Sequence, residues 1–78
     1  MPTMKQLRQD AGLTAFQLAY MAGVSLSSIN RMEQGKKPVT RLTAGKVIHA
    51  LSRHIGRLIT LQDIEGLKIA EVEDEDRE

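Results

Sequence analysis

Residues 12–35, with the sequence GLTAFQLAYMAGVSLSSINRMEQG, hold the patterns that decide the fold. Thr14 is followed three residues later by Gln17, which is the spacing of a capping box at the start of a helix. Small and apolar residues then continue to Ala22 without a break. The first half of the stretch therefore predicts a short helix that ends at about Ala22.

The second half of the stretch predicts another short helix after a tight turn. Gly23 ends the helix that begins after Thr14 and permits the turn, because glycine readily adopts the backbone conformation that closes a helix. Ser25 is a suitable N-cap for a helix that runs until Gly35. Ile29 and Met32 have the spacing of residues on one inward face.

Three further helical segments are predicted outside this stretch. They are a first helix from about Met4 to Ala11, a fourth that starts after Thr40 and closes at Gly56, and a short final turn over 60–63. The side chains of the fourth helix that are expected to reach the core are Leu42, Val47, Ile48 and Leu51. Strand patterns are nearly absent. The predicted fold class is all-α, a compact bundle of about five short helices.

The charges divide the chain into a basic body and an acidic end. Residues 1–58 carry a net charge of +7, and residues 59–78 carry −6. Such a basic body favours a polyanionic partner. We expect one domain over residues 1–66 and an acidic tail over 67–78 that is either disordered or partner-binding. The apolar alternation that begins at Leu67 could pair only with a partner edge.

The two helices and their turn resemble the phage-repressor and Cro-like helix-turn-helix family, also described as XRE-type or lambda-repressor-like. The resemblance covers roughly residues 4–58. It rests on the Leu18-Ala19 pair, on Gly23-Val24-Ser25 at the turn, on the inward Ile29, and on Glu33 with Gly35 at the end of the third helix. It implies a sequence-specific DNA-binding regulator in which helices 2 and 3 form the helix-turn-helix.

The third helix has the polar outer face that the major groove of DNA requires, since the groove admits one helix. Arginine pairs with guanine and asparagine with adenine through two hydrogen bonds, whereas serine accepts or donates and leucine contacts a thymine methyl. The residues predicted to read bases are Ser25, Leu26, Ser27, Asn30 and Arg31.

Cations and amides beside the turn are predicted to bind DNA phosphates, which sets affinity and register without reading sequence. These residues are Gln17, Gln34, Lys36, Lys37 and Arg41. Taken singly, each exposed cation is equally well explained as a solvated surface residue. Their clustering beside the turn favours the DNA-binding interpretation.

Two further positions bear on the resemblance, one that differs from the family pattern and one pair that fits it. The family commonly has glutamine directly after the capping threonine, where its side chain supports binding to the DNA backbone, and this chain has Ala15 there. In this chain the contact with the DNA backbone is therefore lost, shifted to Gln17, or irrelevant. Family members often pair an arginine of the first helix with the glutamate that ends the third, and Arg8 with Glu33 fits that pattern. The resemblance implies a structural ion pair.

Phe16 and Tyr20 lie together on the second helix, nearly opposite its small and apolar face. Two interpretations remain open for these aromatics. Either a loop or the C-terminal segment covers them, or they form a docking patch for a second subunit or another protein.

Other function classes find little support in the sequence. Cysteine is absent, and His49 and His54 are out of phase for a ligand pair, so we expect no metal and no cofactor. The motifs of nucleophilic and phosphate-loop enzymes are missing, so we expect no enzyme. No apolar run approaches the length of a membrane span. We expect a cytoplasmic, nucleoid-associated protein without a membrane partner.

The leading hypothesis is a small transcriptional regulator that binds double-stranded operator DNA as a homodimer, and more specifically a repressor. Two alternatives remain. One is the antitoxin of a toxin–antitoxin pair that represses its own operon, with the C-terminal segment binding the toxin. The other is a protein–protein adaptor on a helix-turn-helix scaffold, with the aromatics or the C-terminal segment as its contact surface.

Overall fold

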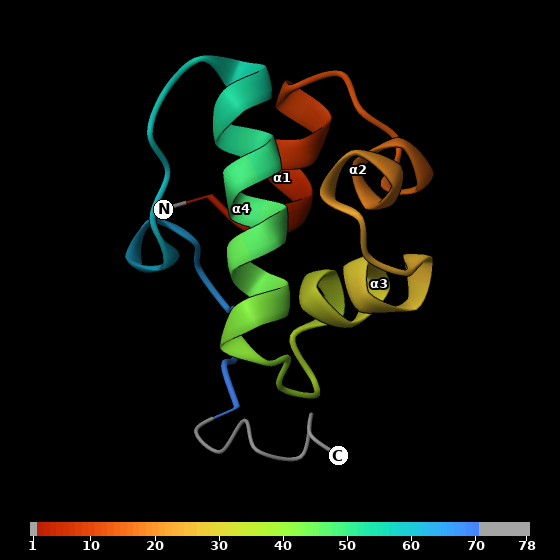
Figure 1. Ribbon diagram of the computed structural model, residues 1–78. Coiled ribbons are helices and arrows are strands. Elements are labelled where there is room, and N and C mark those ends of the chain that lie inside the picture. The colour runs from red at the N-terminus through yellow and green to blue at the C-terminus, as the bar shows by residue number, and fades with distance from the viewer. Residues whose placement is uncertain (1, 71–78) are drawn as a thin grey trace.

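The computed structural model describes residues 2–70 of the 78-residue chain. The order of its elements is α1 (Met4–Asp10), α2 (Ala15–Ala22), α3 (Leu26–Gln34), α4 (Arg41–Ile55) and the 3-10 turn η1 (Leu61–Asp63) (Figure 1). The all-α class is confirmed, and no strand occurs in the described part. Four α-helices are found where five helices were predicted, because the fifth element is only a three-residue 3-10 turn. The predicted tail lies outside the described residues from 71 onward.

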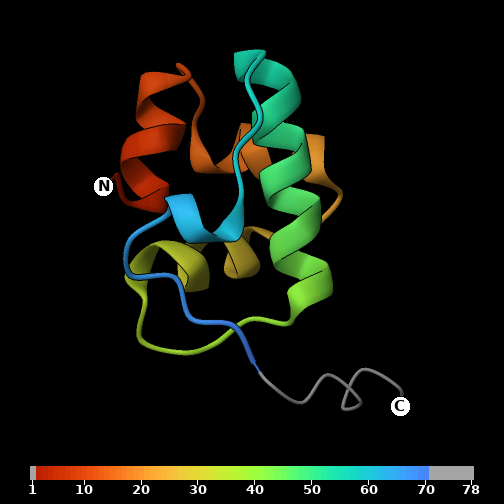
Figure 2. The same ribbon diagram turned by 90° about the vertical axis from the view of Figure 1, so that its left-hand side faces the viewer.

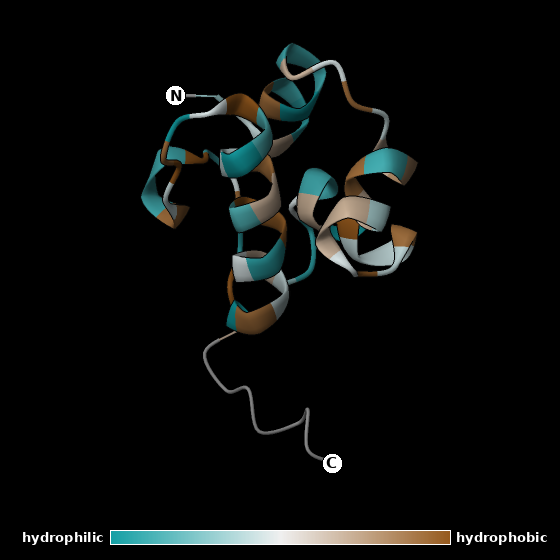
Figure 3. Ribbon diagram, turned by 45° about the horizontal axis from the view of Figure 1, so that its top comes forward, coloured by the Kyte–Doolittle hydropathy of each residue, from teal (hydrophilic) through white to brown (hydrophobic). Residues whose placement is uncertain are grey.

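The core forms where the helices meet. α2 packs against both α3 and α4, and α1 packs against α3. Each helix turns one apolar face inward, and along α4 hydrophilic and hydrophobic residues alternate accordingly (Figure 3). The buried residues of the four helices are Met4, Leu7, Leu18, Ala19, Ile29, Met32, Ala44, Val47, Ile48 and Leu51. Sheltering these side chains from water is the main stabilising contribution to a domain of this size.

Leu42 corrects one prediction about the core. Its side chain is 61% exposed, although the sequence predicted that it would reach the core. The inward face of α4 instead includes Ala44, which is fully buried. Two residues along a helix turn by about 200°, so Leu42 and Ala44 cannot share a face.

A threonine or serine side chain caps the start of each of the four α-helices. The predicted capping box of α2 is confirmed: the Gln17 N–H donates to Thr14 Oγ1 at 3.0 Å, and the Thr14 N–H donates to Gln17 Oε1 at 2.8 Å. α1 has the same capping box between Thr3 and Gln6, which was not predicted although the two residues have the same spacing. These caps satisfy backbone N–H groups that the first turn leaves unpaired.

Residues 64–70, which we call the C-terminal strap, lie along the loop between α3 and α4 (Figure 2). The Val39 N–H donates to the Lys68 carbonyl oxygen at 3.1 Å, and the Ala70 N–H donates to the Val39 carbonyl oxygen at 2.7 Å. The prediction that this stretch pairs only with a partner edge is therefore wrong. The apolar side chains of the strap pack against the chain's own core. This packing places the backbone of the strap beside Val39.

Gly35 ends α3 beside the strap. Its φ of +69° lies in the left-handed region that side chains disfavour. A Cβ atom at this position would lie 2.8 Å from the Gly66 carbonyl oxygen. Gly35 therefore permits both the end of α3 and the approach of the strap.

Replacement of Gly35 by alanine is expected to lower the free energy of unfolding by about 2 to 3 kcal/mol, because a left-handed backbone and a steric overlap are both imposed. Gly23→Ala is the matched control. Gly23 has a φ of +73°, but a Cβ atom there would meet nothing within 4 Å, so only the backbone cost of about 1 kcal/mol is expected. Urea unfolding of both variants measures the difference, and equal losses would contradict the role given to Gly66.

Candidate nucleic-acid interface

The turn between α2 and α3 is closed by backbone hydrogen bonds and a serine cap. The N–H groups of Gly23 and Val24 both donate to the Ala19 carbonyl oxygen, at 2.9 and 3.1 Å. Ser25 Oγ then accepts from the Ser28 N–H at 3.1 Å, which starts α3. A three-residue turn, 23–25, thus fixes the direction of α3 relative to α2.

α3 has one buried face and one exposed face. Ile29 is fully buried and Met32 nearly so. The exposed residues Ser27, Asn30, Arg31 and Gln34 follow the spacing of one helical face. The inward contacts therefore hold the helix while a polar surface remains available to a partner.

That polar surface continues into the α3–α4 loop, residues 35–40, as one shallow hollow of about 260 Å³. No carboxylate contributes to its lining among the described residues. Its lining residues are Ser27, Asn30, Arg31, Gln34, Lys36 and Lys37. Three residues predicted to read bases and three predicted to bind phosphates thus meet in one place. We call this set the α3 hollow.

The other four predicted DNA contacts lie outside the α3 hollow, and all four are exposed. They are Ser25, Leu26, Gln17 and Arg41. Gln17 already uses its amide oxygen in the α2 capping box, so the amide nitrogen is the group that remains for a phosphate. The Ser25 hydroxyl is likewise engaged at the start of α3.

An ion pair joins α1 to the end of α3. Arg8 donates from Nε and Nη2 to the two carboxylate oxygens of Glu33, the second bond at 3.1 Å. Arg8 Nη1 also donates to the Leu13 carbonyl oxygen at 2.9 Å. The two charged side chains are 12% and 11% exposed. The paired geometry ties α3 to α1 and to the segment that leads into α2.

The C-terminal strap is a positioning element that the sequence did not predict. Because Val39 is held by Lys68 and Ala70, the strap fixes the loop that carries Lys36 and Lys37. The alternation after Leu67 was visible in the sequence, but nothing local indicated Val39 as its partner.

Phe16 and Tyr20 form an aromatic pair on the outer face of α2. Their exposed fractions are 68% and 82%. Within residues 2–70, no loop covers these two side chains and neither does the strap. The interpretation that a loop or the C-terminal segment covers them is therefore wrong for the described part of the chain.

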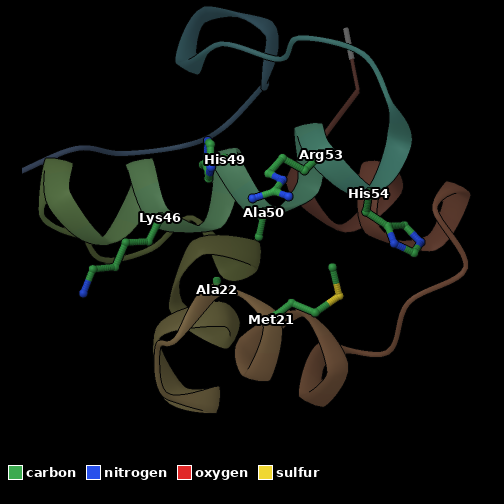
Figure 4. Close-up of a pocket in the computed structure, with 7 residues that line it drawn as sticks. All are labelled: Met21, Ala22, Lys46, His49, Ala50, Arg53 and His54. Atoms are coloured by element: carbon green, nitrogen blue, oxygen red, sulfur yellow. The ribbon is translucent and has the colours of Figure 1, made fainter.

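A second groove, of about 480 Å³, lies between α2 and α4 (Figure 4). Met21 and Ala22 line one side, and α4 supplies the rest. The α4 residues are Lys46, His49, Ala50, Arg53 and His54. His54 Nε2 lies 3.1 Å from the Ala11 carbonyl oxygen, and so links α4 to the end of α1.

Two searches of residues 2–70 bear on other site classes. No group of three or more His, Cys, Asp or Glu side chains is placed to hold a metal ion within this range. No helix of the described part is long and apolar enough to cross a membrane.

Comparison with protein families places the chain in a known family. The family model described as "Helix-turn-helix domain" matches residues 3–63, which is more than half of the chain. Comparisons with curated proteins and with solved structures found no match. The matched range includes all four α-helices and η1. Domains of this family are typically non-enzymatic and bind DNA, which supports DNA as the partner and transcription regulation as the role. The chain belongs to the helix-turn-helix domain family.

Proposed function

We propose that the protein is a sequence-specific regulator of the phage-repressor and Cro-like type that inserts α3 into the major groove of its operator. The observation that carries this proposal is the α3 hollow, in which side chains predicted to read bases adjoin side chains predicted to bind phosphates. Arg31 and Asn30 supply paired hydrogen bonds to base edges, and Ser27 adds a donor or an acceptor. Ser25 and Leu26 extend this contact at the start of α3.

Phosphate binding in this proposal comes from both sides of α3. Lys36, Lys37 and Gln34 lie beside its C-terminal end. Gln17 lies in the first turn of α2 and Arg41 is the first residue of α4, and both would contact the DNA backbone. Such contacts fix the register of the helix on the duplex and give the salt-dependent part of the affinity.

We further propose a homodimer that acts as a repressor. One module of this size reads only a few base pairs. Two modules related by a twofold axis would read half-sites about 34 Å apart and multiply their discrimination. A bound dimer of this kind hinders other proteins at the operator, which is the simplest route to repression.

A protein–protein adaptor is the second candidate, and the exposed pair Phe16 and Tyr20 favours it. Large exposed aromatics are enriched where proteins bind each other. Phe16→Ser with Tyr20→Ser separates the candidates. If the variant keeps its DNA binding and its assembly state, the two aromatics contribute neither to operator binding nor to the dimer. If the variant loses a protein that binds stably to the unchanged chain, the chain is an adaptor or an antitoxin.

The charge contacts of the proposal are tested by the salt dependence of binding. Lys36→Gln with Lys37→Gln is expected to make the negative slope of log K against log salt shallower by about 2, because each phosphate contact contributes about −0.9. Affinity should fall by a similar factor for every duplex sequence. Titration of labelled duplex at several salt concentrations measures both quantities.

Lys5→Gln with Lys46→Gln removes the same charge from α1 and from the middle of α4, away from the α3 hollow. Its slope should stay near that of the unchanged protein. Equal slopes for the two double variants would mean that the α3–α4 loop has no special role, and a protein that binds no duplex would refute DNA binding altogether.

A further inference from the structure

We propose that the groove between α2 and α4 is a binding site for a small organic anion with an apolar body, such as an aromatic carboxylate. Two kinds of lining carry this inference, namely basic side chains along α4 and apolar side chains from both helices. The groove and the α3 hollow share no lining residue. Binding at the groove is therefore a property separate from the proposed reading of DNA, and it can be measured without DNA.

The size of the groove fits a small ligand. Its volume of about 480 Å³ lies within the range of about 300 to 1,000 Å³ that is usual for small-molecule sites. Two helices wall it, and α4 contributes five of its seven lining residues. A stable protein partner needs about 20 to 30 residues on each side of the interface. The groove by itself is therefore too small for a protein interface and matches the body of a small molecule.

Apolar side chains from both helices form one part of the lining. Met21, which is 42% exposed, reaches from α2 toward α4 (Figure 4). Ala22 and Ala50 complete the apolar lining. An apolar ligand body placed here would remove the thioether and methyl surface from water, which is favourable. A DNA phosphate has no such body and gains nothing from this part of the groove.

Basic side chains form the other part of the lining. Lys46 and Arg53 are about two helical turns apart on α4, with Ala50 between them. Figure 4 shows the Arg53 side chain running back along α4 toward Ala50. Among residues 2–70, neither cation has a carboxylate partner and no carboxylate lines the groove. A guanidinium binds a carboxylate through two parallel hydrogen bonds, so Arg53 is the group that would hold the anion.

The test measures the binding of three probes to the 78-residue chain by the shifts of its backbone amide signals. Naphthoate has a carboxylate and an apolar body, naphthamide has the same body without the charge, and acetate has the charge without the body. At low salt, naphthoate is expected to bind about three- to fivefold tighter than naphthamide, because it adds an exposed ion pair. Acetate should bind more weakly than naphthoate. If either control probe binds as tightly as naphthoate, the proposed ligand class is wrong.

The amide signals that shift identify where the probe binds. The signals of Met21, Ala22 and Ala50 should move with naphthoate, and those of Lys36 and Lys37 should stay in place. The α3 hollow has cations but no apolar residue in its lining, so it serves as an internal control. Shifts of equal size at the groove and at the α3 hollow would overturn the assignment of the site.

Two single variants test the role of Arg53. Arg53→Gln removes the guanidinium and should bring the affinities for naphthoate and naphthamide to within about twofold of each other. Arg57→Gln is the matched control, because it removes an exposed arginine that does not line the groove. This variant should keep the preference for naphthoate. An equal loss of preference in both variants would mean that only net charge matters, and would overturn the role of Arg53.

Adding duplex DNA in a separate titration distinguishes this inference from the proposed function. The duplex should shift the amide signals of Asn30 and Arg31 and leave those of Met21 and Ala50 unchanged. If naphthoate saturates the groove but the chain binds no duplex, the site stands and the proposed function fails. If the chain binds duplex but naphthoate does not saturate the groove, the proposed function stands and this inference fails.

Discussion

Replacing Arg8 by alanine is expected to lower the free energy of unfolding by about 3 kcal/mol. The change leaves the Glu33 carboxylate, which is 11% exposed, without its cation. The Leu13 carbonyl oxygen loses a donor as well. Removal of one member of a largely buried pair costs more than the pair contributes, because the remaining charge stays desolvated. Urea unfolding with linear extrapolation measures the loss.

Two further variants sharpen this result. Arg53→Ala removes an exposed arginine from α4 and should change the free energy of unfolding by no more than about 0.5 kcal/mol. Arg8→Met with Glu33→Leu replaces both charges by apolar groups and should recover a large part of the loss. A loss below about 1 kcal/mol for Arg8→Ala would mean that the pair behaves like an exposed one and does not hold α3 in place.

Replacing Asn30 and Arg31 together by alanine is expected to reduce discrimination between operator and random duplex by a factor of about 30 or more, because each paired hydrogen bond to a base contributes about 1 to 3 kcal/mol and two such contacts are removed. Both side chains are exposed, so the free energy of unfolding should change by less than about 0.5 kcal/mol per site. Competition titrations with operator and random duplexes measure the ratio.

The matched comparison is Lys36→Gln with Lys37→Gln, which changes two residues of the same hollow. This variant should bind all duplexes more weakly while its discrimination remains. If the Asn30 and Arg31 variant instead loses affinity uniformly and keeps its ratio, those two side chains contact phosphates and the base-reading role belongs elsewhere.

Local patterns predicted the helices well, because their ends are set by neighbouring residues. Thr14 with Gln17 placed the start of α2, and Gly23 and Gly35 placed the ends of α2 and α3. These signals involve residues three or four positions apart, and the same physics holds in the folded chain. The prediction that Leu42 reaches the core was wrong, because it followed from hydrophobicity alone and not from the position of Leu42 around the helix.

Contacts between distant segments were harder to predict. The strap pairs with Val39 across about thirty residues, and nothing in the alternation after Leu67 identifies that partner. The Arg8–Glu33 contact was expected only from the family resemblance, since no local spacing relates the two positions. The hollow formed by α3 and its following loop likewise depends on how the strap positions Lys36 and Lys37.

Whether α3 reads DNA sequence is decided by selecting, from a pool of random-sequence duplexes, those that the 78-residue chain retains. We expect an enriched palindromic motif with half-sites about one helical turn apart, and loss of that enrichment when Asn30 and Arg31 are replaced by alanine. Absence of any enriched motif, with only weak binding that salt abolishes, would contradict sequence reading by α3.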